Sequence, residues 1–147
     1  DDMTDPVADS ARSLLDGHVV LSRKLAELGH YPAVDPLASV SRLMNSVVSK
    51  EHLLASQRFK AIYATYQGAE DMINIGALAP GANRRIDRAV SLIDRVNEFL
   101  LQPIGQRCEF QQTVKWLLDI TKSWDFLLPA EQDLPPEVPA GPNEADA

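Results

Sequence analysis

Gly29-His30-Tyr31-Pro32-Ala33-Val34-Asp35-Pro36-Leu37-Ala38-Ser39-Val40-Ser41-Arg42 brings a tyrosine ring, two prolines, two serines and one arginine together in a single short run. Tyr31 precedes a proline, so its backbone is biased to an extended form from which the ring could serve as a platform for a purine base. Arg42 offers a planar fork of N–H donors that suits phosphate oxygens. On this chemistry alone a packed Tyr-Pro turn and a surface ion pair are the stronger interpretation, and half of a nucleotide site is the alternative.

The residues before this run predict a small α/β unit. Asp5-Pro6 is typical of a helix start, with Asp as N-cap and Pro at the first helical position, and Gly17 ends that helix. Short strands are expected at residues 18–22 and 31–34, with a short helix at 23–28 between them. This strand-helix-strand order is typical of an α/β sheet with parallel crossovers. Because two strands do not make a stable sheet alone, we expect further strands upstream in a longer parent protein, of which this chain is a fragment.

The pattern changes to helices after the serine-arginine pair. Helices are expected at residues 49–67, 69–75, 83–101 and 109–124, with Ser49 and Asn83 as N-caps. Apolar residues recur at helical spacing in three of them: Ala55, Phe59, Ile62, Tyr63 and Tyr66 in the first; Ile86, Ala89, Val90, Ile93, Val96 and Leu100 in the third; Phe110, Val114, Leu117, Thr121 and Trp124 in the fourth. The chain should therefore be mostly helical.

Composition limits the class of protein. The chain has 147 residues, 45% of them hydrophobic, and a net charge of −7. This charge argues against a nucleic-acid partner, because no basic face is available to displace phosphate counterions. The single cysteine, Cys108, excludes an internal disulfide and fits a reducing cytoplasm. His18, His30 and His52 are too scattered for a metal motif, and no apolar run reaches membrane-spanning length.

Several runs resemble the rotary ATPase superfamily at the point where its catalytic subunit leaves the nucleotide-binding domain. They include Asp1-Asp2-Met3-Thr4-Asp5-Pro6, Tyr31-Pro32-Ala33-Val34-Asp35-Pro36 and Ser41-Arg42. The run from Ala8 to Arg23 resembles the export ATPases of the flagellum and of type III secretion more than the beta subunit of ATP synthase. The resemblance implies the α/β edge of a RecA-like nucleotide-binding domain at residues 1–45 and an all-α helical C-terminal domain at 46–128. Residues 129–147, rich in proline and acidic residues, are expected to form a disordered tail.

The resemblance assigns roles to individual residues. Arg42 falls at the arginine that reaches into the neighbouring subunit's site and stabilises charge on the transferring phosphoryl group, with a structural ion pair as the alternative. Tyr31 is similar to the tyrosine that stacks on adenine. Ile104, Arg107 and Phe110 fall in the segment that closes the other side of the adenine pocket. Ile104 departs from the family's aromatic residue there, and packing in the core is the alternative for Ile104 and Phe110.

A loop with two glycines and a proline is expected between the second and third helices of the helical part. In rotary ATPases the corresponding loop faces a central stalk, so the resemblance implies a docking site for a coiled-coil partner. Its predicted residues are those of the loop and of the basic helix start that follows: Gly76, Leu78, Pro80, Gly81, Arg84, Arg85 and Arg88. The alternative is that the arginines only solvate the helix.

The chain contains no GxxxxGK[ST] phosphate loop, so alone it should not hydrolyse ATP. The resemblance implies a parent that is a bacterial, cytoplasmic ATPase using ATP and Mg²⁺, a homo-hexamer at the inner face of a membrane export apparatus. It would bind a coiled-coil stalk and export chaperone-cargo complexes. The alternatives are a non-catalytic helical docking module and an ATP synthase beta subunit, although residues 78–83 lack the acid that the synthase has in its loop. The choice between flagellum and injectisome stays open.

Overall fold

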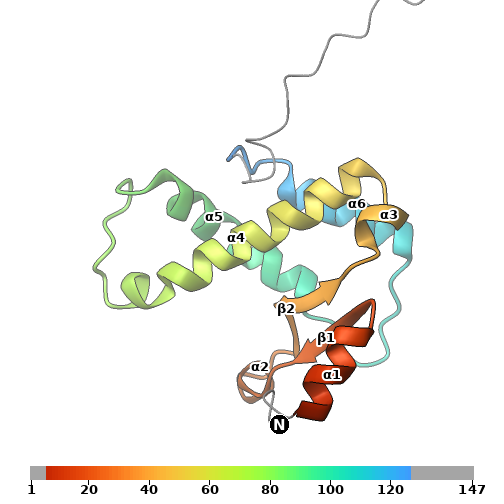
Figure 1. Ribbon diagram of the computed structural model, residues 1–147. Helices are drawn as coiled ribbons and strands as arrows, with labels where there is room; N and C mark the ends of the chain where they lie inside the picture. The colour runs from red at the N-terminus through yellow and green to blue at the C-terminus, as the bar shows by residue number, and fades with distance from the viewer. Residues whose placement is uncertain (1–5, 127–147) are drawn as a thin grey trace, which may run out of the picture.

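The computed structural model describes residues 6–126, so the predicted N-cap Asp5 and the predicted tail at 129–147 lie outside the described residues. A small α/β unit at the N-terminus is followed by a helical unit that α4 spans from α3 to the loop before α5 (Figure 1). This order agrees with the expected edge of a nucleotide-binding domain followed by an all-α domain. None of the described helices is both long and apolar enough to cross a membrane.

The N-terminal unit consists of α1 (Pro6–Leu14), β1 (Gly17–Leu21), α2 (Arg23–Glu27) and β2 (Val34–Ser41). The two strands are antiparallel, with Gly17 opposite Ser41 and Leu21 opposite Val34. The expectation of a parallel crossover was therefore wrong. The connection holds a helix of only five residues, capped by the Ser22 hydroxyl, and it turns the chain back as a hairpin instead of crossing a face of the sheet.

The second strand begins later than predicted. Tyr31 and Pro32 lie in a bend joined by a cis peptide bond, and the strand runs from Val34 to Ser41 instead of ending at Val34. It continues past Pro36 because the pairing is interrupted there by an irregularity, the kind of place in which a strand tolerates proline. The predicted strand at 31–34 thus overlaps the observed one only at Val34.

The irregularity in β2 is held by two side chains. The Asp35 carboxylate accepts hydrogen bonds from the amides of Leu37 and Ala38, at 2.9 and 3.0 Å. The Ser39 hydroxyl donates to the Asp35 carbonyl and accepts from the Val20 amide at 3.0 Å. These bonds satisfy backbone groups that the sheet leaves unpaired, and they fix the path of the chain toward Arg42.

The helical unit contains α3 (Met44–Val47), α4 (Lys50–Asn74), α5 (Arg84–Leu100) and α6 (Phe110–Thr121). Both predicted caps are confirmed, since the Ser49 hydroxyl accepts from the His52 amide and the Asn83 side chain accepts from the first turn of α5. Two helices were predicted where α4 is one helix through Gly68. A glycine inside a helix costs about 1 kcal/mol, and burial of the long apolar face of α4 outweighs that cost.

The core lies where α4, α5 and α6 meet. Its fully buried side chains include Ile62 from α4, Val96 from α5 and Ile120 from α6, together with Trp124 just after α6. The predicted apolar faces account for most of it. Leu92 and Ile120 are buried and were not predicted, whereas Val90 and Phe110 are exposed although they were placed on the apolar faces.

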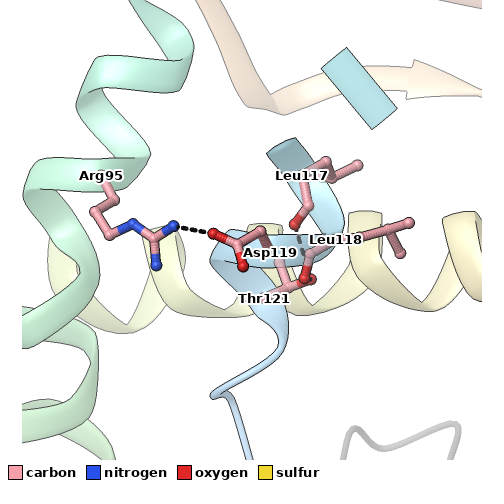
Figure 2. Close-up of polar contacts among 5 residues, drawn as sticks. All are labelled: Arg95, Leu117, Leu118, Asp119 and Thr121. Atoms are coloured by element: carbon pink, nitrogen blue, oxygen red, sulfur yellow. Dashed lines mark hydrogen bonds and ion pairs between the residues drawn. The ribbon is translucent and has the colours of Figure 1, made fainter. Parts of the chain in front are cut away.

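An ion pair joins α5 to α6 at the edge of this core, and a buried hydroxyl bonds within the last turn of α6 (Figure 2). Arg95 reaches from α5 to the Asp119 carboxylate on α6. The buried Thr121 hydroxyl donates to the carbonyl oxygens of Leu117 and Leu118, at 2.9 and 3.3 Å. The ion pair is exposed and contributes little to stability, so the packing of the core supplies most of the rigidity that joins the two helices.

Candidate functional site

The first candidate site is built where the bend before β2 meets the end of α5. The Gln102 amide donates to the Tyr31 carbonyl at 2.9 Å, which joins two segments that the sequence assigned to opposite sides of an adenine pocket. The Tyr31 side chain is 55% exposed. The structure therefore brings the two predicted segments together and leaves the tyrosine ring open to solvent.

The segment after Gln102 is a shaped loop. The Gln102 side-chain amide donates to the Gln106 carbonyl at 2.8 Å, and Gly105 has a φ of 86°, a value that favours glycine. Ile104 is fully exposed and Phe110 is 65% exposed. Neither side chain is in the core, so the packing alternative for both is wrong.

The predicted adenine residues are all exposed. A pocket of about 750 Å³ lies beside them, lined by residues that include Pro32, Pro103 and Trp116. Tyr31, Ile104, Arg107 and Phe110 are absent from the lining of that pocket. This pocket therefore does not bring the four predicted side chains together.

Arg42 lies at the end of β2 and is anchored mainly through its backbone. Its amide donates to the Asp16 carbonyl at 2.8 Å, and its guanidinium makes one contact, to the Ser13 carbonyl at 3.3 Å. The side chain is exposed, and it has no carboxylate partner among residues 6–126. The ion-pair alternative therefore finds no support in the described part of the chain. Lys60 donates to the Ser39 carbonyl at 2.9 Å and ties this end of β2 to α4.

The second candidate site is the tip between α4 and α5, at the end of the helical unit that Figure 1 draws farthest from α3 and α6. Gly76 and Gly81 have φ values of 68° and 86°, which suit glycine and make the two bends of the loop. The Gly81 amide donates to the Asp87 carboxylate at 3.1 Å. Pro80 is exposed and Leu78 is half-buried. The tip is thus a bent, ordered surface on a rigid pair of helices.

The three predicted docking arginines have an unexpected role. Arg84 pairs with Asp125, Arg85 lies over the Trp124 ring at 5.5 Å, and the Arg88 Nε donates to the Ser123 carbonyl at 2.9 Å. They fasten residues 123–126, which we call the C-terminal arm, onto α5. The prediction that they only solvate the helix was therefore wrong, and the role in docking a partner stays untested.

Sequence reasoning missed the residues that position these sites. Asp35, Ser39 and Gln102 hold the two segments of the nucleotide side, and the arm holds the arginines. Asp35-Pro36, at the start of the irregularity in β2, is a known turn signal and could have been recognised. The contacts of Gln102 and of the arm join distant segments, and no local pattern encodes them. Among the described residues, no group of three or more His, Cys, Asp or Glu side chains could hold a metal ion.

Comparison with known proteins follows the same division of the chain. Residues 48–119 match the model of the type III secretion system EscN ATPase C-terminal domain. Residues 1–41 match the nucleotide-binding domain of the ATP synthase alpha/beta family. The chain belongs to the family of type III secretion and flagellar ATPases.

Individual relatives agree with this family. The chain is 48% identical over 121 residues to a type 3 secretion system ATPase of Pseudomonas savastanoi pv. phaseolicola, covering 82% of this chain and 27% of that protein. It is 42% identical over 117 residues to a flagellum-specific ATP synthase of Salmonella typhimurium, covering 80% and 26%. The chain thus spans about a quarter of the length of the relatives it matches.

The fold also matches a solved export ATPase. The assembled ATPase EscN of enteropathogenic E. coli superposes with a TM-score of 0.80 and 37% identity, covering 82% of this chain and 29% of that one. EscN in complex with its central stalk EscO superposes with a TM-score of 0.75. The match to the EscN C-terminal domain model favours the export branch over an ATP synthase beta subunit for the helical unit.

Proposed function

We propose that this chain is the C-terminal region of a hexameric ATPase that energises type III protein export, in a flagellum or an injectisome. In this role it contributes one wall of an adenine pocket, an arginine that acts on the neighbouring subunit's nucleotide, and a tip that meets a central stalk. The hydrogen bond from the Gln102 amide to the Tyr31 carbonyl carries the proposal, because it joins both halves of the adenine wall.

The residues of the adenine wall fit part of a nucleotide. Tyr31, Ile104 and Phe110 each expose a side chain that can stack on or pack against a base. The chain has no phosphate loop, so the phosphates and Mg²⁺ would be held by residues outside these 147. ATP bound in the complete protein supplies the phosphoryl group that is transferred to water, and Tyr31 holds its base.

Arg42 suits a role in trans. Its backbone is fixed at the end of a strand by the Asp16 carbonyl, while its guanidinium has most of its donors free of partners among the described residues. An arginine finger needs a fixed backbone and an available planar guanidinium to stabilise the charge on a phosphoryl group. We propose that assembly into a hexamer places the fork in a neighbour's site.

The tip provides the mechanical output. The core of α4, α5 and α6 is rigid, and it connects the end of β2 with the tip loop. A movement at the nucleotide would therefore reach the tip as a rigid-body displacement. EscN was solved with its central stalk EscO, and we propose an equivalent coiled-coil partner at the tip here. Association with chaperone-cargo complexes and with the cytoplasmic face of a membrane export apparatus belongs to the same proposal.

The proposal is tested by the affinity of the full-length protein for ATP after changes at Tyr31. Removing a stacked ring costs about 1–3 kcal/mol, which is about a 5- to 150-fold loss. Tyr31→Ala should weaken binding of a fluorescent ATP analogue by that factor, and Tyr31→Phe, the matched control, should keep the affinity. If Tyr31→Ala binds as tightly as the unchanged protein, Tyr31 does not contact the base and the adenine wall is misplaced.

A further inference from the structure

The C-terminal arm brings the chain to an arginine-rich face of α5. This face consists of Arg84, Arg85 and Arg88 on the first two turns of the helix. Arg84 is neutralised by Asp125. The Arg84 guanidinium also lies 5.6 Å from the centroid of the Phe126 ring, so the chain leaves the arm in direct contact with this face.

Two of these arginines carry a positive charge that no described carboxylate neutralises. The Arg85 guanidinium rests on the rings of Trp124 and Phe126, at 5.5 and 6.0 Å, and has no carboxylate partner among the described residues. Arg88 uses its Nε for the neutral Ser123 carbonyl, and it likewise has no carboxylate partner in residues 6–126. The arginine face can therefore bind an anionic ligand.

The sequence that follows the arm has the complementary charge. Residues 127–147 contain no Lys or Arg and carry five carboxylates, which are Glu131, Asp133, Glu137, Glu144 and Asp146. Glu131 is only five residues beyond Phe126, a contour length of at most about 18 Å. A tethered segment this short is present at an effective concentration of about millimolar.

We propose that the acidic segment 127–147 occupies the arginine face of α5 through Arg85 and Arg88, and that an acidic partner has to displace it. The arm sets the register, because Trp124 is 1% exposed in the core and Phe126 already contacts the arginine face. The attraction is between exposed charges, so it weakens as salt rises. One consequence rests on the proposed function: the segment would cover a surface on which the stalk docks, and rising salt would uncover it.

The segment's contact with the arginines is tested on the full 147-residue chain by NMR. The Nε–Hε signals of Arg85 and Arg88 are compared with those of a neutral-tail variant carrying Glu131→Gln, Asp133→Asn, Glu137→Gln, Glu144→Gln and Asp146→Asn. We expect both signals to shift in the variant. Raising salt from about 0.01 M to about 1 M, which shortens the Debye length from about 30 to about 3 Å, should move the unchanged chain toward the variant. Signals that are identical in the two chains at low salt would overturn the proposal.

Competition is tested with a polyglutamate peptide as the probe. The neutral-tail variant should bind it about tenfold more tightly than the unchanged chain at low salt, as expected if the internal segment, at about 1 mM effective concentration, binds the face with a Kd of about 0.1 mM. Adding Arg85→Gln and Arg88→Gln should abolish that gain, whereas the charge-matched control Lys24→Gln with Arg42→Gln should retain it. Equal affinities of the variant and the unchanged chain would reject the mask.

Chemical shifts that change on dilution would show contact between chains and reject the intramolecular form. Neither assay uses nucleotide or stalk, so these results are independent of the proposed function.

Discussion

Replacing Gly17 with alanine should loosen the strand pair that carries Arg42. Gly17 pairs with Ser41, and a Cβ added to it would lie 2.6 Å from the Val40 carbonyl oxygen and 3.1 Å from the Ser41 Cα. Both atoms belong to the backbone of β2, so no flexible side chain can move aside. The strands have to separate, and the Arg42 amide bond to the Asp16 carbonyl lies directly beside the clash.

The expected cost of Gly17→Ala is about 1–3 kcal/mol, the usual range for inserting a group into a packed site. Gly68→Ala is the matched control, because no atom lies within 4 Å of the added Cβ and the position is inside α4. That change should stabilise the chain by about 0.5–1 kcal/mol. Urea unfolding of the 147-residue chain measures both changes, and ATP turnover of the full-length protein should fall for Gly17→Ala only.

The reasoning would be refuted if Gly17→Ala had the same free energy of unfolding as the unchanged chain. It would also fail if both alanine variants shifted stability in the same direction. A destabilised Gly17→Ala protein with normal turnover would separate the two claims. In that case the steric account would stand, and the position of Arg42 would not matter to catalysis.

Two further predictions follow from burial and from composition. Burial raises the pKa of Tyr63 above 10.0, and its hydrogen bond to Gln67 opposes the rise. The unfolded chain therefore loses this proton first, and stability should fall as the pH rises past about 10. Tyr63→Phe should flatten that fall in thermal melts recorded between pH 8 and pH 11, and an equally steep fall in the variant would count against this cause. The isolated 147-residue chain should show no Mg²⁺-dependent ATPase activity above background in a phosphate-release assay, because it has no phosphate loop, and measurable turnover would mean that the catalytic groups lie within it.

The helical unit could be predicted from local signals because those signals agree with its packing. Ser49 and Asn83 cap the helices they were expected to cap. Helical periodicity placed Phe59, Ile62 and Val96 in the core, where they are buried. Periodicity fixes a face only to within one position, so Leu92 and Ile120 were missed while Val90 was wrongly included.

The sheet was harder to predict, because strand direction depends on contacts across the chain. The short connection after β1 forms a hairpin, and its helix does not cross the sheet. The irregularity at Asp35 lets β2 continue through Pro36 to Ser41, since side-chain bonds replace the missing ladder there.

The candidate site could be predicted only as far as family motifs reach. Resemblance indicated Tyr31 and Arg42, and the structure places the first beside the Gln102 segment and the second on the surface. The clamp of arginines on the C-terminal arm depends on Trp124 packing in the core, which brings two distant segments together. No spacing along the sequence announces such a contact.

The most direct test of the account is a mixing experiment with full-length subunits. Subunits with Arg42→Ala should bind ATP yet turn over about 10³-fold more slowly, and their stability should change by no more than about 1.5 kcal/mol, the value of one hydrogen bond to a neutral carbonyl. Subunits with a defective phosphate loop should also be inactive. Mixed rings should regain part of the activity, because an intact Arg42 from one subunit would serve the intact nucleotide site of its neighbour. Mixed rings that stay inactive, together with a less stable Arg42→Ala subunit, would contradict the arginine's action in trans.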